Sequence, residues 1–239
     1  MPSAAGIDKS GAAIRDMFAG VAPRYDLLNH LLSGSLDLVW RRRAAAALGL
    51  PAGSRVLDLC AGTGDQALAL RRRGLRVVAA DFCVPMLALA RPKFERSGKE
   101  DGRRPVPLAA DALALPFPAG HFDGATVAFG LRNVADLDGG LQELSRAVRP
   151  GGRVAILEFA LPRARALRAL YLFYFRRLLP RIGRLLSPRG SAYSYLPSSV
   201  LEFPQRDDFL DRLRAAGFVE LAWRDLAGGT VCLYLGKRP

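Results

Sequence analysis

The sequence has little cysteine and histidine and no long apolar run, and each shortage excludes a class of protein. Three cysteines are too few, and odd in number, for a disulfide framework, which favours a reducing, cytoplasmic setting. These cysteines and the two histidines show no metal-ligand spacing, so no metal site is expected. No apolar run approaches the about 20 residues that span a bilayer, and the N-terminus lacks the apolar segment of a secretory signal.

Lysine is also scarce, yet the chain is strongly basic. Only four of its 35 basic residues are lysines, against 22 acidic residues, and the formal net charge is +13. The abundance of alanine, glycine and leucine beside arginine is typical of a compositional bias. The charge nevertheless attracts phosphates, anionic lipids or anionic substrates.

The 239 residues suffice for one large domain, so we expect a single domain over residues 1–239. Residues 1–50 carry apolar side chains at helical spacing and are expected to form an N-terminal helical cap. After the break at "PAGS", short apolar runs alternate with helical patterns. This order predicts an α/β fold with a doubly wound, mostly parallel sheet. The expected strands are 55–61, 76–82, 106–112, 122–130 and 153–160.

The pattern changes after Ala160. We expect a helical insert over residues 161–203 on the substrate side, in which residues 163–200 carry eight arginines, six aromatic residues and no acid. A helix over 206–218 and two strands then finish the chain. Gly228 and Gly229 predict a hairpin between those strands, which would make one terminal strand antiparallel to the others.

Glycines and carboxylates gather at the expected strand ends. Gly62 and Gly64 follow the first strand, where glycine permits a tight turn and the close approach of a ligand. Asp58 lies inside that strand, and Asp81 and Asp111 end the second and third strands. A dinucleotide, suggested by the pattern G-x-G-x-x-A, would use Asp81 alone. A ligand with an ammonium group, one ribose and adenine uses all three acids, and S-adenosylmethionine is such a ligand.

Several motifs carry a family resemblance. "LDLCAGTGD", "AADF" and "AADALALPFP" resemble the cofactor motifs of class I methyltransferases, which have a Rossmann-like fold. "YDLLNHLLSGSLDLVW", "AFGLRNV", "RAVRPGGRVAILEFA" and "YSYLPSSVLEFP" resemble the narrower family of C-methyltransferases of menaquinone and ubiquinone biosynthesis. The resemblance extends from about Met17 to Tyr234.

The resemblance implies a seven-stranded sheet with an antiparallel last strand, and S-adenosylmethionine as the cofactor. It implies cofactor contacts from Thr63, Asp81, Asp111 and Ala112. The expected cofactor site therefore comprises Asp58, Gly62, Thr63, Gly64, Asp81, Asp111, Ala112 and Ala128. Some positions depart from the family pattern, which usually has serine at Ala128 and Ala160, histidine at Asp37 and methionine at Leu28.

The family reaction implies catalytic roles near "FGLRN". Methylation of a ring carbon needs electron density, which an adjacent ionised hydroxyl supplies. We therefore expect Arg132 to stabilise the developing oxyanion and Asn133 to position it. Tyr25, Asp26 and Asn29 are candidates for closing the site. The alternative for Arg132 is a structural ion pair with Asp136 or another acid.

The expected substrate is a prenylated quinol, with demethylmenaquinol favoured over a benzoquinol. A methyltransferase acting on another small aromatic substrate or on RNA is the alternative, although "FGLRN" is not the Pro-Pro-aromatic motif of amino-group methylation. We expect no nucleic acid partner. Residues 163–200 are expected to admit the prenyl tail and to contact the membrane surface peripherally. A lid over the sheet and a homodimer surface are the other interpretations of this segment.

Overall fold

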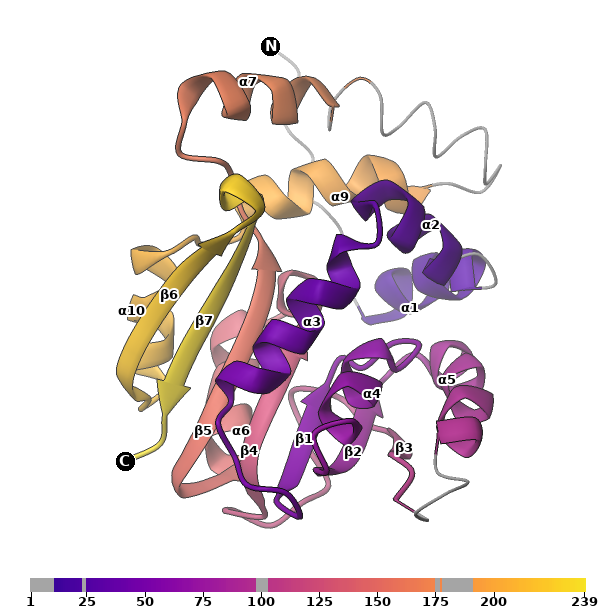
Figure 1. Ribbon diagram of the computed structural model, residues 1–239, viewed down its shortest axis with the longest axis vertical. Helices are drawn as coiled ribbons and strands as arrows, with labels where there is room; N and C mark the ends of the chain where they lie inside the picture. The colour runs from indigo at the N-terminus through magenta and orange to yellow at the C-terminus, as the bar shows by residue number, and fades with distance from the viewer. Residues whose placement is uncertain (1–10, 23–24, 98–102, 175–176, 178–190) are drawn as a thin grey trace.

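A mixed sheet of seven strands lies at the centre of the described part of the chain (Figure 1). The computed structural model describes residues 11–22, 25–97, 103–174, 177 and 191–239. The strands are β1 (Arg55–Leu59), β2 (Arg76–Asp81), β3 (Val106–Ala109), β4 (Phe122–Ala128), β5 (Val148–Phe159), β6 (Val219–Leu226) and β7 (Val231–Lys237).

The strand order is β3-β2-β1-β4-β5-β7-β6. Strands β1 to β5 pair in parallel, whereas β7 is antiparallel to both β5 and β6. In Figure 1 the arrow of β7 accordingly runs against that of β5. The expected α/β class and the antiparallel terminal strand are both confirmed. Because β6 and β7 are joined through the short turn Ala227–Gly229, in which Gly228 and Gly229 have positive φ angles, the hairpin forms where the two glycines predicted it.

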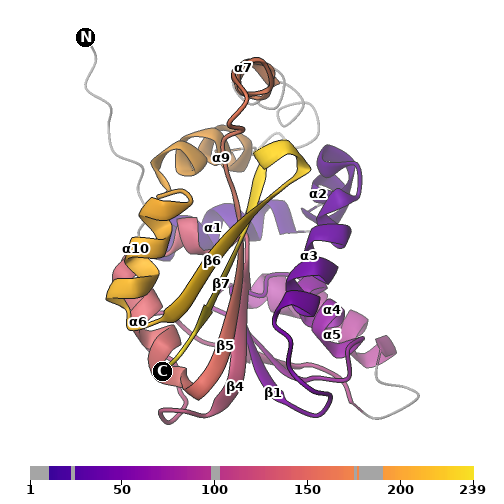
Figure 2. The ribbon, with the colours of Figure 1, turned by 60° about the vertical axis from the view of Figure 1, so that its left-hand side comes forward.

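Helices cover both faces of the sheet (Figure 2). On one face lie α6 (Leu137–Ala147) and α10 (Asp207–Ala215), and on the other lie α3 (Leu36–Ala47), α4 (Asp65–Arg71) and α5 (Val84–Ser97). Each face has its own core. Leu144 and Phe209 pack with β4 and β5 in the first, and Leu48, Leu70 and Phe94 with β1 and β2 in the second. Strands buried on both faces explain the continuous apolar runs in the sequence.

Four helices lie toward the carboxyl ends of the parallel strands (Figure 1). They are α1 (Gly11–Val21), α2 (Tyr25–Ser33), α7 (Arg165–Phe173) and α9 (Ser191–Glu202). Residues 175–176 and 178–190 of the expected insert lie outside the described residues. Among the described helices, none is both long and apolar enough to cross a membrane. The carboxyl edge of the sheet is therefore framed by the N-terminal helices and by helices of the segment between β5 and α10.

The turn from β1 into α4 depends on Gly64. This residue has φ +86°, and a Cβ placed on it would lie 2.4 Å from the ring of Phe94 on α5. Gly62 also has a positive φ, +55°, but its Cβ would meet only the Met86 Cε, at 3.8 Å. The close packing of α4 on α5 thus excludes a side chain at Gly64 specifically.

Gly64→Ala is expected to destabilise the protein more than Gly62→Ala. The left-handed backbone costs alanine about 1–2 kcal/mol at either position, and overpacking against Phe94 adds about 1–3 kcal/mol at Gly64 alone. Urea unfolding followed by circular dichroism measures both free energies of unfolding. Equal losses in the two variants would contradict the role assigned to Phe94.

Candidate functional site

A cavity of about 210 Å³ opens at the carboxyl ends of β1, β2, β3 and β4. This is where ligands bind in open α/β sheets. Phe18 of α1 and Arg41 of α3 complete its wall. Of the residues expected at the cofactor and catalytic sites, those that line it are Gly62, Thr63, Asp81, Asp111, Ala112, Ala128 and Asn133.

Asp81 ties the end of β2 to the glycine loop. Its Oδ2 accepts a hydrogen bond from the Gly62 amide at 2.7 Å, and its Oδ1 accepts one from the Cys83 amide at 2.8 Å. Burial raises the pKa of this carboxyl group, and both backbone hydrogen bonds oppose that shift. Each oxygen keeps a further lone pair, so Asp81 can brace the loop and still accept ligand hydroxyl groups.

Asp58 lies beneath the loop and does not line the cavity. Its side chain is fully buried, and its Oδ1 accepts a hydrogen bond from the Thr126 hydroxyl at 3.1 Å. Its Oδ2 has no hydrogen-bond partner among the described residues. Burial raises the pKa of Asp58 from 3.8 to about 7, although the nearby Arg41 guanidinium lowers it. Because Asp58 lies outside the described cavity wall, its expected contact with an ammonium group stays a prediction.

Asp111 and Ala112 follow β3 in a turn. The exposed Asp111 carboxylate accepts a hydrogen bond from the Leu113 amide at 2.9 Å, and Asp111 also forms an isolated bridge with Ala114. Ala112 is buried and packs in the core on the α6 side. This turn therefore brings one carboxylate and several apolar groups to the same wall of the cavity.

The arginine of "FGLRN" meets a glutamate. Arg132 lies in a short 3₁₀ helix, η2 (Leu131–Asn133), and is only 7% exposed. Its Nη1 donates to the Phe129 carbonyl and lies 3.1 Å from Oε2 of Glu158, at the end of β5. Its guanidinium also lies 5.3 Å above the ring of Phe159. Asp136, the acid named first as an alternative partner, instead caps α6 by accepting from the Gly139 amide.

The two polar residues of η2 have different surroundings. Asn133 lines the cavity, and its Oδ1 has no hydrogen-bond partner among the described residues. The described cavity wall does not include Arg132, which is directed to the buried end of β5. Glu158 was not selected from the sequence. The feature of the sequence that could have indicated Glu158 is that it is the one acid in the otherwise apolar run "VAILEFA".

A charged network joins the N-terminal helices to the glycine loop. Asp26 of α2 accepts a hydrogen bond from the Thr63 hydroxyl and forms an ion pair with Lys93 of α5. Lys93 also contacts Asp65, at the start of α4, at 2.8 Å. Asn29 is half-buried on α2. Tyr25 begins α2, but its side chain and that of Leu28 lie outside the described residues.

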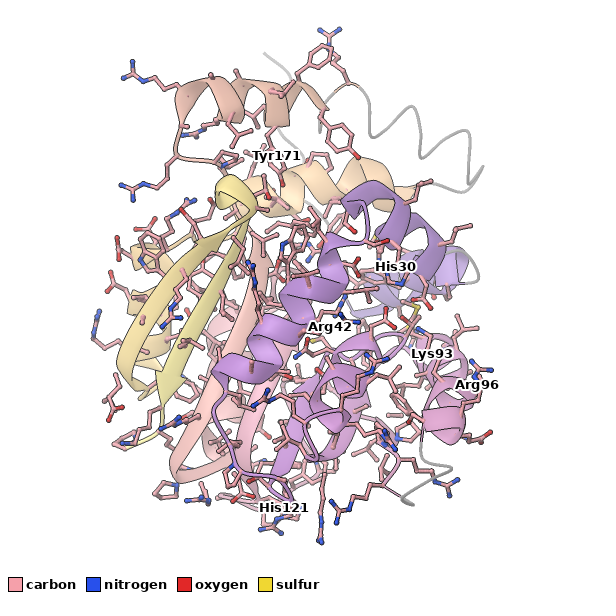
Figure 3. The ribbon with its side chains drawn as sticks, in the orientation of Figure 1. His30, Arg42, Lys93, Arg96, His121 and Tyr171 are labelled. Carbon is pink, nitrogen blue, oxygen red and sulfur yellow. The ribbon has the colours of Figure 1, made fainter. Side chains whose placement is uncertain are left out.

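Next to this network, His30 lies between two carboxylates. Its Nδ1 is 3.0 Å from Asp37 and its Nε2 is 3.7 Å from Asp65. Figure 3 shows His30 and Lys93 approaching from α2 and α5, whereas His121 lies at the far end of the molecule. His30, Asp37 and Asp65 offer atoms within 4.8 Å of one another, a spacing compatible with a metal ion. Lys93 and Arg41 already approach these carboxylates, so the protein supplies its own cations there.

Comparison with known proteins identifies the family. The model of the ubiE/COQ5 methyltransferase family matches residues 7–238. This chain belongs to that family. It is 49% identical to a demethylmenaquinone methyltransferase of Thermus thermophilus, over 93% of this chain and 100% of the relative. It is 45% identical to the ubiquinone/menaquinone biosynthesis C-methyltransferase UbiE of Geobacter sulfurreducens, over 97% and 91%.

Solved structures agree with the fold. A SAM-dependent methyltransferase of Thermotoga maritima, described as a possible histamine N-methyltransferase, aligns with a TM-score of 0.66 at 18% identity, covering 95% of this chain and all of that one. The [4+2]-cyclase SpnF aligns with a TM-score of 0.68 at 18% identity, covering 95% of each chain. The resemblance to quinone-biosynthesis methyltransferases and the class I methyltransferase fold are both confirmed. The chain is a methyltransferase.

Asp58→Asn is expected to change stability in a pH-dependent way. Because the folded-state pKa of about 7 lies above 3.8, the folded protein holds this proton more tightly than the unfolded chain. Stability is therefore lost as pH rises from about 4 to 7, by up to about 1.4 kcal/mol per pH unit. Asparagine stays neutral, so the variant gains stability relative to wild type over that range. Urea unfolding at pH 5, 6, 7 and 8 measures the difference, and a constant difference would contradict this assignment.

Proposed function

We propose that this chain transfers a methyl group from S-adenosylmethionine to a ring carbon of a prenylated quinol, in menaquinone or ubiquinone biosynthesis. The observation that carries the proposal is the family match over residues 7–238, with relatives of 45% and 49% identity that are named for this reaction. Demethylmenaquinol is the favoured substrate.

The described cavity supports S-adenosylmethionine as the methyl donor. We assign Asp81 to the ribose hydroxyls, because both of its oxygens retain a lone pair. Asp111 with Ala112, in the wall of the cavity, suits adenine. Gly62 leaves room for close approach at the loop. When bound, the cofactor supplies a methyl group on a positively charged sulfur.

The residues of η2 supply the substrate chemistry in this proposal. A ring carbon becomes nucleophilic when the neighbouring hydroxyl loses its proton. The fixed positive charge of Arg132 favours the ionised form. Asn133 lines the cavity, and its buried, unpartnered Oδ1 would give a ring hydroxyl an acceptor. The contacts of Asp26 with Thr63 and Lys93 support a role of α2 in closing the site.

The purified protein is expected to methylate demethylmenaquinol carrying a two-isoprene tail. With deuterated methyl donor, mass spectrometry should find one labelled methyl on the ring, while bulk RNA stays unlabelled. Asp81→Ala should weaken cofactor binding at least about 10-fold in calorimetry, since charged hydrogen bonds contribute about 1.5–3 kcal/mol. Asp138→Ala, at an exposed position of α6 outside the cavity wall, is the control. Labelling of RNA or of a non-prenylated phenol in place of the quinol would overturn the substrate assignment.

We also propose that α7 contacts an anionic membrane surface, where a prenylated substrate resides. Leu170 and Phe173 are 64% and 63% exposed on this helix, an unusual exposure for such large apolar groups. Arg163, Arg165 and Arg168 are exposed beside them. Apolar groups flanked by arginines on an amphipathic helix fit the interface of an anionic bilayer.

Replacing Arg163, Arg165 and Arg168 together by glutamine should weaken binding to phosphatidylglycerol vesicles. Each arginine near an anionic surface contributes about 1 kcal/mol, so a loss of roughly 100-fold is expected, with further weakening by salt. The matched control replaces Arg72, Arg73 and Arg76, which are exposed at the opposite end of the sheet. Vesicle sedimentation measures binding and analytical ultracentrifugation the oligomeric state. The membrane assignment would be overturned if the wild-type protein bound no vesicles. It would also be overturned if the wild-type protein were a dimer and the α7 variant a monomer.

A further inference from the structure

The buried carboxylate of Glu158 has no role in the assignments above. It is fully buried at the carboxyl end of β5, and both of its oxygens lie within 3.3 Å of Arg132 Nη1. Oε2 also accepts the Phe159 amide at 3.2 Å. Burial raises the pKa of Glu158, although Arg132 lowers it. A buried ion pair of this kind contributes little net stability, because desolvation offsets the attraction.

The groups around this pair are mostly hydroxyls and thiols. Helix α9 packs against η2 and carries Tyr195, whose hydroxyl interacts electrostatically with Arg132 and Glu158, as does that of Tyr171 on α7. Cys60, which directly follows β1, and Tyr234 of β7 also interact electrostatically with Glu158. Cys232 is the register partner of Glu158 on β7. Of these charged and titratable neighbours, Arg132 alone carries a fixed positive charge. The charge of Glu158 therefore decides whether Arg132 is neutralised.

Three buried polar atoms near the pair lack hydrogen-bond partners among the described residues. They are Arg132 Nε, Asn133 Oδ1 and the Tyr195 hydroxyl. Leaving such groups unpaired costs free energy, and native proteins rarely do so without reason. Two of them lie on η2 and the third on the helix that packs against it. A ligand bearing hydroxyl groups, which both donate and accept, would satisfy all three, so we infer that the polar edge of the quinol ring lies between η2 and α9.

We propose that Glu158 accepts the proton of the quinol ring hydroxyl, with the Tyr195 hydroxyl carrying it, and that Arg132 then changes partner from Glu158 to the ring oxygen. This inference rests on the proposed function. The O–H bond of the ring hydroxyl breaks, and its electron pair stays on the ring oxygen. The Tyr195 oxygen takes the released proton and passes the proton of its own hydroxyl to Glu158. The ring carbon then forms its bond to the methyl group as the bond from methyl to sulfur breaks.

The remaining protons balance. The methylated carbon loses its hydrogen to water, the ring regains its aromatic electrons, and Glu158 returns a proton through Tyr195 to the ring oxygen. One proton leaves the enzyme per turnover. During the first step one buried anion disappears as another forms beside the same guanidinium, so the net buried charge stays constant. Transfer to an acceptor outside this pair would leave an additional buried charge, which is costly.

Glu158→Gln tests the acceptor. It keeps an oxygen for Arg132 and loses the proton site. Turnover of demethylmenaquinol at pH 7 should fall about 100-fold or more, the scale expected for loss of general acid–base catalysis, with unchanged cofactor affinity. The loss should shrink as pH rises and the quinol ionises by itself. Glu143→Gln is the matched control, since Glu143 also pairs with an arginine, Arg146, but on α6. It should retain wild-type turnover.

Binding of 4-nitro-1-naphthol, which is ionised at pH 8, tests the partner change without methyl transfer. With S-adenosylhomocysteine present, wild type should take up about one proton per naphtholate, because Arg132 leaves Glu158 and the carboxylate is protonated. Calorimetry in buffers of different ionisation enthalpy measures this uptake, which Glu158→Gln should abolish. A purely structural ion pair would show no uptake in either protein.

Tyr195→Phe supplies a second test, because it removes one unpartnered hydroxyl and should leave folding intact. Its turnover should fall at least about 10-fold at pH 7 and recover partly at higher pH. Full turnover in this variant, pH-independent loss in Glu158→Gln, or absent proton uptake would overturn the proposal. Failure of wild type to methylate the quinol would instead overturn the proposed function, while leaving the naphtholate measurement interpretable.

Discussion

Burial of charge at the carboxyl edge of the sheet is the constraint on which this structure depends. Asp58, Asp81 and Glu158 end or nearly end three parallel strands, and all three are at most 7% exposed. Each is stabilised differently: Asp58 by a threonine hydroxyl, Asp81 by two backbone amides, and Glu158 by a guanidinium. The glycine loop, the turn after β2 and η2 take the shapes that these contacts require. The contacts that fix the backbone of these loops and the polar groups available to ligands therefore lie at the same edge of the sheet.

Much of this arrangement could be predicted from the sequence. Alternation of apolar runs and helical patterns determines the parallel sheet, and Asp81 and Asp111 could be placed because strand ends meet at one edge. The hairpin at Gly228 and Gly229 depends on local turn chemistry alone. Motifs near these residues were specific enough to indicate the family, which the family model confirms.

The partners of the charged residues could not be predicted. Arg132 and Glu158 are separated by 26 residues in the chain, and Asp26 and Lys93 by 67, so only tertiary packing brings each pair together. The direction of the Arg132 side chain also depends on η2, a single 3₁₀ turn with no periodic signal in the sequence. The sequence indicated that Arg132 follows the fourth strand, as the structure shows, but the neighbouring Asn133 is the residue that lines the cavity.

Lys93 has a consequence for the kinetics of this enzyme. One ammonium group serves as the counter-ion of both Asp26 on α2 and Asp65 on α4. Any movement that separates α2 from α4 must expose these carboxylates to water and break at least one ion pair. Dissolved salt screens partly exposed pairs of this kind, so it lowers the free energy of the opened arrangement relative to the closed one. The rate at which ligands leave the cavity should therefore depend on ionic strength even where they carry no charge themselves.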